Sequence, residues 1–112
     1  MPFSDYKTAL VTGASSGIGA AIVERFCQEG LQVHALARSA DALKELATRT
    51  GATPQIIDVR DVDALTRLTG DIEFDILVNC AGINFPGSIA NATAEQIDAE
   101  VAVNLQPALH LI

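Results

Sequence analysis

The stretch T-G-A-S-S-G-I-G, residues 12–19, decides the fold of this chain. It carries three glycines in the spacing G-x-x-x-G-x-G, after the short apolar run T-A-L-V-T and before an amphipathic segment. An apolar run cut off by glycine is typical of a buried strand, and apolar residues three and four apart are typical of a helix. The stretch therefore predicts a tight glycine turn that leads from a strand into a helix.

Glycines at such a turn let the backbone bend tightly and let a phosphate group approach without a Cβ in the way. The start of the following helix adds unpaired N–H groups and the positive end of the helix dipole. The loop thus predicts an anion cradle. It lacks the G-K-[ST] ending of a nucleotide triphosphatase loop, which disfavours phosphoryl transfer. A glycine turn without any ligand is the alternative.

Outward from this loop, apolar strand-like segments alternate with helical ones. The expected strands are residues 8–12, 31–37, 55–59 and 76–80. Strands that are continuously apolar and interleaved with helices are buried on both faces, which requires a parallel sheet with right-handed crossovers. The predicted fold class is therefore α/β, a doubly wound parallel sheet in three layers.

The first three expected helices cover residues 16–30, 39–51 and 61–68, the last being weaker. The first two end at glycines, which suit the left-handed conformation found after a helix terminus. Ser39 and Asp41 open the second helix. The apolar positions of the first helix are Ile18, Ala21, Ile22 and Phe26.

A last helix is expected to begin at Thr93, where Gln96 three residues later completes a capping box. Pro107 lacks an N–H, so the carbonyl of Val103 loses its usual helical partner and a kink near Asn104 follows. Asn104 is either a functional residue or a polar residue that only bends the helix. The apolar stripe of this helix is Ile97, Val101, Leu105, Ala108, Leu109 and Ile112.

Length and composition narrow the class of protein. The 112 residues suffice for one domain, and 49% hydrophobic against 19% charged residues excludes a disordered chain. The net charge of −7 argues against binding to nucleic acid or to an anionic membrane through a broad basic surface. Cys27 and Cys80 lie in apolar segments without metal-ligand spacing, so reduced core thiols and no metal site are expected. Without an apolar span or secretory signal, the expected location is the cytoplasm.

Four features resemble the short-chain dehydrogenase/reductase family in order and spacing: the glycine loop, Asp58-Val59, Asn79-Cys80-Ala81-Gly82, and Asn104. The resemblance implies a Rossmann-like sheet and an oxidoreductase that moves hydride between a nicotinamide cofactor and an alcohol or carbonyl. It runs from Lys7 to Ile112 but corresponds only to the amino-terminal, cofactor-binding part of that family's domain. Residues 1–112 are accordingly expected to form a single dinucleotide-binding domain whose carboxyl-terminal part is missing.

The resemblance also implies roles for individual residues. The side chain of Asp58 would meet the adenine amino group and the backbone of Val59 the adenine ring. The alternative for Asp58 is a cap for the helix at Asp61. Asn104 would support catalysis by holding a water of the proton relay through its carbonyl. The implied cofactor-binding residues are Gly13, Ser15, Ser16, Gly17, Ile18, Gly19, Arg38, Asp58, Val59, Asn79, Ala81 and Gly82.

The end of the second strand predicts which cofactor is preferred. An acidic residue there binds the ribose 2′-hydroxyl of NAD, whereas a nearby arginine accommodates the 2′-phosphate of NADP. Ala37 occupies the acidic residue's place, and Arg38 follows it. NADP(H) is therefore the expected cofactor, with NAD less favoured, although Ser16 stands where many NADP-preferring members carry a second basic residue. The alternative is that Arg38 is a solvated residue at the start of the second helix.

The catalytic Ser and the Tyr-x-x-x-Lys motif of the family are not found in the expected place. Tyr6 precedes the first strand, and the two lysines, Lys7 and Lys44, come too early. We therefore weigh two main functions: an oxidoreductase whose remaining residues lie beyond Ile112, and a truncated, non-catalytic dinucleotide-binding module. A sugar-nucleotide or flavin-reducing relative with the same fold is a third alternative, which the glycine spacing fits less well. Family resemblance further implies a homo-dimer or homo-tetramer and a small-molecule substrate, whose pocket residues 84–88 would line at one edge.

Overall fold

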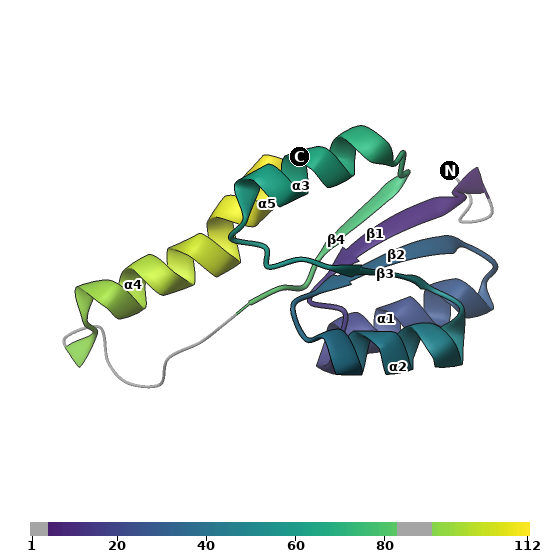
Figure 1. The fold of residues 1–112 in the computed structure, drawn as a ribbon, viewed down its shortest axis with the longest axis horizontal. Helices are drawn as coiled ribbons and strands as arrows, with labels where there is room; N and C mark the ends of the chain where they lie inside the picture. The colour runs from purple at the N-terminus through teal and green to yellow at the C-terminus, as the bar shows by residue number, and fades with distance from the viewer. Residues whose placement is uncertain (1–4, 83–90) are drawn as a thin grey trace.

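The computed structural model describes residues 5–82 and 91–112 (Figure 1). Four strands form one sheet in the order β3-β2-β1-β4, and every neighbouring pair is parallel. The first strand along the chain therefore lies inside the sheet, between the second and the fourth. This arrangement confirms the predicted parallel α/β fold. The strands are β1 (Thr8–Thr12), β2 (Gln32–Ala37), β3 (Thr53–Ile56) and β4 (Ile76–Asn79).

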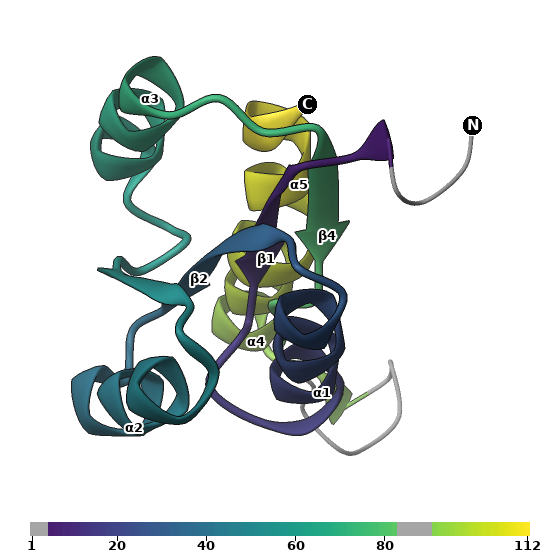
Figure 2. The same cartoon turned by 90° about the vertical axis from the view of Figure 1, so that its right-hand side faces the viewer.

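Helices cover both faces of the sheet, which gives three layers (Figures 1 and 2). Helices α1 (Gly17–Gln28) and α2 (Ala40–Thr50) pack on one face. Helices α3 (Val62–Asp71) and α5 (Gln106–Leu111) pack on the other face. In the part of the chain that the structure describes, no helix combines the length and the apolar character that a membrane crossing needs.

The core consists of two apolar clusters, one on each face of the sheet. Neighbouring residues of β1 supply both, because successive side chains of a strand point to opposite faces. Val11 packs with Val23 of α1 and Leu43 of α2, whereas Leu10 packs with Leu65 of α3 and Leu111 of α5. Val11, Val23, Leu43 and Leu10 have no exposed surface. Strands β1 and β2 are thus buried on both faces, as predicted, whereas β3 is largely exposed and β4 is half-buried.

The third strand lies earlier in the chain than residues 55–59, and that prediction was wrong in its boundaries. Its last sheet partner is Ala37, which pairs with Ile56 and accepts a hydrogen bond from the N–H of Ile57 at 3.1 Å. The chain then turns, because the N–H of Asp61 donates to the carbonyl of Asp58 at 2.9 Å. Ile57 and Asp58 therefore lie beyond the strand, where β2 offers no further backbone partner.

Half of the apolar face predicted for helix α1 is confirmed. Ile22 and Phe26 are half-buried against the core, whereas Ile18 is 75% exposed and Ala21 is also exposed. The fully buried residues of this helix are Gly19 and Val23. The glycine loop sets this orientation, because it places Gly19 directly against the backbone of Gly13. Ile18 is thereby turned outward at the carboxyl edge of the sheet.

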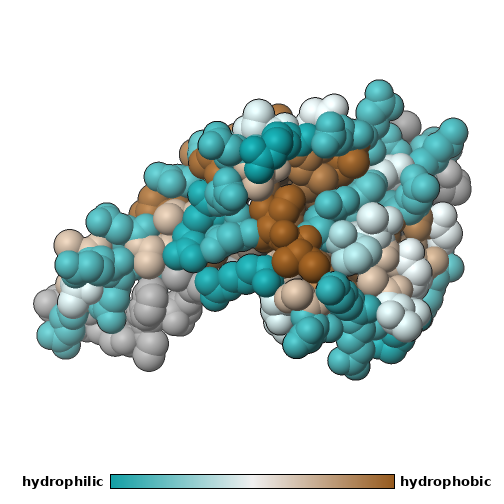
Figure 3. Space-filling model, in the orientation of Figure 1, coloured by the Kyte–Doolittle hydropathy of each residue, from teal (hydrophilic) through white to brown (hydrophobic). Residues whose placement is uncertain are grey.

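The free edge of β3 carries a proline. The N–H of Ile57 points toward β2, so strand alternation turns the nitrogen of Pro54 away from the sheet. Proline has no N–H to offer there, which removes one donor that another strand could pair with. Figure 3 shows apolar surface at this edge between α2 and α3, where Ile56 is 46% exposed.

The last helical segment begins with the predicted capping box. The hydroxyl of Thr93 accepts from the N–H of Gln96 at 3.1 Å, and the side-chain oxygen of Gln96 accepts from the N–H of Thr93 at 3.0 Å. Helix α4 (Ala94–Glu100) follows and extends beyond the sheet (Figure 1). The predicted apolar stripe of this segment is largely exposed, and the buried residues are instead Val103, Pro107 and Leu111.

The break predicted near Asn104 takes the form of a π turn over Val101–Leu105, which joins α4 to α5. The N–H of Gln106 donates to the carbonyl of Val101, five residues earlier. Pro107 is the second residue after this turn and cannot donate to Val103, so the ordinary i+4 spacing cannot continue unbroken. The first part of the predicted stripe lies in α4, which extends beyond the sheet and has no buried residue.

Candidate functional site

A cavity of about 490 Å³ lies at the carboxyl ends of the strands. Ligands of open parallel sheets bind at this edge, where the strand order reverses between β1 and β4. Four segments that follow β1, β2, β3 and β4 form its wall, together with one residue of the π turn. The lining residues are Gly13, Ser15, Ser16, Ile18, Gly19, Ala37, Arg38, Ser39, Ile57, Asp58, Val59, Cys80, Ala81, Gly82 and Val103.

The glycine loop leaves no room for side chains at two positions. A Cβ added to Gly13, whose φ is +63°, would lie 2.6 Å from the backbone nitrogen of Ala81. A Cβ on Gly19 would collide with the carbonyl oxygen of Gly13. Gly17 has a φ of +58° and faces open space, so its requirement for glycine is conformational. The loop thus presents bare backbone and the start of α1 to the cavity, which fits a pyrophosphate group.

Thr12 ties this loop to the segment after β4. Its side chain is 1% exposed, and its hydroxyl accepts from the N–H groups of Cys80 and Ala81 at 3.2 Å each. The same hydroxyl donates to the carbonyl of Val78 at 3.5 Å. One buried side chain therefore fixes the relative position of two walls of the cavity.

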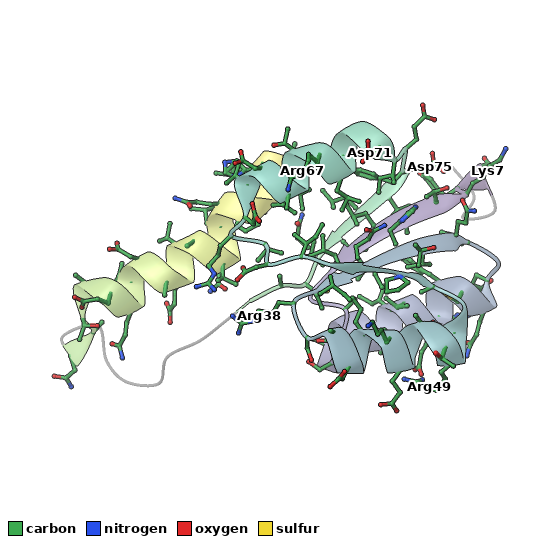
Figure 4. The ribbon with its side chains drawn as sticks, viewed as in Figure 1. Lys7, Arg38, Arg49, Arg67, Asp71 and Asp75 are labelled. Atoms are coloured by element: carbon green, nitrogen blue, oxygen red, sulfur yellow. The ribbon has the colours of Figure 1, made fainter. Side chains whose placement is uncertain are left out.

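The wall after β2 carries no carboxylate. Ala37 ends the strand and is 7% exposed, and Arg38 and Ser39 follow it along the cavity. Arg38 makes no hydrogen bond or ion pair with the residues that the structure describes. Figure 4 shows its side chain projecting beyond the carboxyl ends of the strands. Ser39 precedes α2 as its N-cap residue, without a side-chain cap bond.

The wall after β3 carries an ionised carboxylate, Asp58. Its Oδ1 accepts from the backbone N–H of Arg60 at 2.9 Å, and its Oδ2 lies 2.6 Å from Nη2 of Arg60. These hydrogen bonds are the main reason why the pKa of Asp58 falls to about 2, and the charge of Arg38 lowers it further. The alternative role for Asp58, a cap for the next helix, belongs to Asp61, whose Oδ1 accepts from the N–H of Ala64 at 3.1 Å.

Arg60 is the residue of this site that the sequence analysis missed. The available signal was the short spacing in D-V-R-D, residues 58–61, because an aspartate commonly accepts a hydrogen bond from the backbone two residues later. The resulting turn brings the guanidinium of Arg60 onto both carboxylate oxygens of Asp58.

Ten of the predicted cofactor-binding residues lie on the cavity wall. Of the described residues, Gly17 and Asn79 were predicted but are not part of the wall. Asn79 is exposed at the end of β4, where it pairs with Thr12. Asn104 lies next to the wall, since a Cβ on Gly82 would be 3.3 Å from its Oδ1. The predicted pocket edge at residues 84–88 lies outside the described residues.

Known proteins resemble this chain over nearly all of its length. The family model described as short chain dehydrogenase matches residues 7–112. The chain is 38% identical to an uncharacterized short-chain type dehydrogenase/reductase of Sinorhizobium fredii over 98% of its own length. It is 43% identical to the cyclic-di-GMP-binding biofilm dispersal mediator protein of Escherichia coli over 93% of its own length. In each case it spans 45% of the relative.

A solved structure gives the same result for the fold. The crystal structure of BdcA in complex with NADPH superimposes with a TM-score of 0.84 and 40% sequence identity. The match covers 94% of this chain and 44% of the BdcA chain. Together with the parallel sheet and the glycine loop, the family model over residues 7–112 establishes that this chain belongs to the short-chain dehydrogenase/reductase family.

Proposed function

We propose that the chain is the cofactor-binding part of an NADP(H)-dependent oxidoreductase that transfers hydride between nicotinamide and an alcohol or carbonyl. The observation that carries the proposal is the cavity at the carboxyl edge of the sheet, with the bare glycine loop on one wall and Arg38 on another. A dinucleotide needs both a place for its pyrophosphate and a partner for its adenosine end. BdcA, a relative in structure, was solved with NADPH.

The residues of this chain would divide the binding of NADP(H) among them. The loop from Gly13 to Gly19 would hold the pyrophosphate through backbone N–H groups and the positive end of α1. Arg38 would bind the 2′-phosphate, because a free guanidinium forms charge-assisted, bidentate bonds to phosphate. Asp58 would accept from the adenine amino group. Val59, Ala81 and Gly82, with Asn79 at the end of β4, would line the adenine and ribose.

The cofactor, when bound, supplies the hydride for the reaction. What this chain adds to catalysis is Asn104, which lies in the π turn beside Gly82. A π turn inside a helix interrupts the regular pairing of carbonyl groups and is frequent at functional sites. We propose that the carbonyl of Asn104 holds a water of the proton relay. The proton donor itself would come from a Tyr-x-x-x-Lys motif outside this sequence.

Cofactor titration tests the preference directly. NADPH and NADH are titrated against the protein and against Arg38→Ala, with nicotinamide fluorescence as the signal. We expect the unsubstituted protein to bind NADPH more tightly and Arg38→Ala to lose about tenfold or more of its NADPH affinity, the effect of one charged hydrogen-bond partner, while NADH binding changes little. Equal affinity of the unsubstituted protein for both cofactors would contradict the 2′-phosphate assignment.

A non-catalytic dinucleotide-binding module is the second candidate. It is favoured by one observation, namely that the Escherichia coli relative is named for binding cyclic-di-GMP rather than for a reaction. Carbonyl reduction by the full-length protein separates the two candidates. A coding sequence that continues with a Ser and then Tyr-x-x-x-Lys, together with NADPH-dependent turnover, supports the enzyme. Cofactor binding without any turnover supports the module.

A further inference from the structure

Arg38 and Asp58 both line the cavity, beyond β2 and β3, and a third charged side chain, Arg60, is paired with Asp58. Asp58 and Arg60 form an ion pair, with Arg60 Nε within 3.1 Å of Oδ1 and 3.2 Å of Oδ2. Arg38 is close enough for its charge to lower the pKa of Asp58, yet it makes no hydrogen bond or ion pair with any described residue. The group thus holds two positive charges and one negative charge.

Local backbone geometry favours Arg60 as the partner of Asp58. The N–H of Arg60 and the N–H of Asp61 donate to the side chain and the carbonyl of Asp58, so the turn itself brings the guanidinium of Arg60 to the carboxylate. Arg38 belongs to a different loop and has no such backbone link to Asp58. Arg60 therefore forms the pair with a smaller loss of side-chain freedom than Arg38 would.

From this arrangement we infer that Arg60 is a specificity-determining residue: by occupying the carboxylate of Asp58, it keeps Arg38 available for the 2′-phosphate of NADP(H). The inference rests on the proposed binding of NADP(H). Arg60 need not touch the cofactor and acts through the other two side chains, as a positioning residue. Its charge also offsets that of Asp58, which would otherwise repel a phosphate at this end of the cavity.

Loss of Arg60 has a specific consequence in this scheme. The carboxylate of Asp58 would then attract the nearby guanidinium of Arg38, and the 2′-phosphate would have to compete for it. NADH has no 2′-phosphate and would be affected much less. The ratio of NADPH to NADH affinity should therefore fall, rather than both affinities together. Both side chains of the pair are partly exposed, at 49% for Arg60 and 33% for Asp58, so water screens the effect.

The test is a set of four variants of the full-length protein, titrated with NADPH and NADH and with the fragments 2′,5′-ADP and 5′-AMP. Arg60→Gln should lower the NADPH to NADH affinity ratio by about two- to fivefold, as expected for a partly exposed ion pair. Arg60→Lys should retain most of the ratio. The control Arg25→Gln removes the same charge and also breaks an ion pair, with Glu29 on the outer surface of α1, and should leave the ratio unchanged.

The fourth variant, Asp58→Asn with Arg60→Gln, distinguishes this role from a purely structural one. Once the carboxylate is gone, nothing competes for Arg38, so the ratio should return toward that of the unsubstituted protein even if adenine binding is weaker. A merely structural role of Arg60 predicts no such rescue, because the second substitution removes a further hydrogen-bond partner. The ratio of 2′,5′-ADP affinity to 5′-AMP affinity should change across the four variants in the same order as the ratio of NADPH affinity to NADH affinity.

The possible failures are separable. An unsubstituted protein with equal affinity for the two cofactors would overturn the proposed NADP(H) preference and the inference with it. If the unsubstituted protein prefers NADPH and Arg60→Gln keeps the same preference, the inference is wrong and the proposed NADP(H) preference stands. The same holds if Arg60→Gln loses NADPH and NADH affinity equally. Should Arg60→Gln fold poorly, judged by its thermal unfolding, Arg60→Lys and the double variant still decide the matter, since a low ratio in the double variant contradicts the inference.

Discussion

The hydroxyl oxygen of Thr12 lies 3.2 Å from the backbone nitrogen of Ala81 and joins the glycine loop to the segment after β4. The two residues are 69 positions apart in the chain. Thr12 sits at the last position of the inner strand β1, paired with Leu36 on one side and Asn79 on the other. The shape of the cavity therefore depends on a single buried hydroxyl that is not itself a lining residue.

Replacement of that hydroxyl should destabilise the fold. Thr12→Val keeps the volume of the side chain but leaves the N–H groups of Cys80 and Ala81 without their acceptor. We expect the free energy of unfolding to drop by about 1–3 kcal/mol, the cost of unsatisfied buried donors. Urea denaturation of Thr12→Val and of the unsubstituted protein measures this difference in the free energy of unfolding. Thr12→Ser retains the acceptor and should lose less stability, and a larger loss in Thr12→Ser would contradict this explanation.

The two helical glycines of the loop should differ in what they tolerate. Gly19→Ala puts a Cβ against the carbonyl of Gly13, so the loop has to open, and we expect NADPH binding to be lost. Gly17→Ala meets no neighbour but strains a residue with a φ of +58°, at a cost of about 1–2 kcal/mol. Titration with NADPH and thermal unfolding distinguish the two effects.

Gly70→Ala provides the control for both. Gly70 lies inside α3, and a Cβ there meets nothing within 4 Å. Alanine in a helix should stabilise the protein by about 0.5–1 kcal/mol and leave NADPH binding unchanged. An equal loss of binding in all three variants would show that glycine substitutions act on overall stability rather than on the cradle.

Acid should weaken the fold through Asp58. Its pKa is lowered from 3.8 to about 2, chiefly by the side chain and backbone of Arg60. A lowered pKa means that the folded state favours the charged form, so this stabilisation is complete above about pH 4 and is lost as the pH falls toward 2. Asp58→Asn should therefore show a shallower loss of stability over this range when unfolding is followed by circular dichroism. An identical pH profile in the variant would contradict the assignment.

A similar acid effect is expected at the opposite edge of the sheet. The carboxylate of Asp75 accepts from the backbone N–H groups of Lys7 and Thr8, at 2.7 Å and 3.2 Å, and these bonds lower its pKa. Figure 4 shows Asp75 and Lys7 at this end of the molecule. Asp75→Asn should loosen the start of β1, seen as faster amide exchange at Thr8 above pH 4. At pH values below the lowered pKa, the difference from the unsubstituted protein should disappear.

Thiol labelling provides a check on where the cofactor binds. Cys80 lines the cavity. Cys27 instead packs against the apolar cluster on the α1 and α2 face of the sheet, where burial raises the pKa of its thiol. NADPH should slow the alkylation of Cys80 by iodoacetamide and leave that of Cys27 unchanged, as read by mass spectrometry of peptides. Protection of both thiols to the same degree would indicate general stabilisation instead of a ligand in the cavity.

The sequence predicted well those features that depend on neighbours along the chain. The turn at Gly13, the start of α1 after Ser16, the left-handed Gly51 after α2 and the capping box of Thr93 all have the expected places. Each is decided by the backbone conformation or hydrogen bonds of a few consecutive residues. The order of strands and helices follows from the same local signals.

Features that depend on distant partners were predicted less well. The boundaries of β3 depend on where β2 ends at Ala37, and the buried face of α1 depends on the contact between Gly19 and Gly13. The spacing of apolar residues around Ile57 does not show where β2 ends, and the spacing around Ile18 does not show that Gly19 contacts Gly13. Arg60 was missed for a related reason, because a charged side chain in a short loop has no periodic pattern that would show its partner.

The π turn between α4 and α5 makes this segment unusually able to absorb a change in length. A π turn holds one residue more than an α-helical turn, so removing one residue between Val101 and Leu105 would give Gln106 an ordinary i+4 partner. Leu111 would then keep its place beside Leu65 and Leu68. A single-residue deletion should therefore be tolerated better here than at a regular α-helical turn, where it would rotate every later residue by about 100° around the axis.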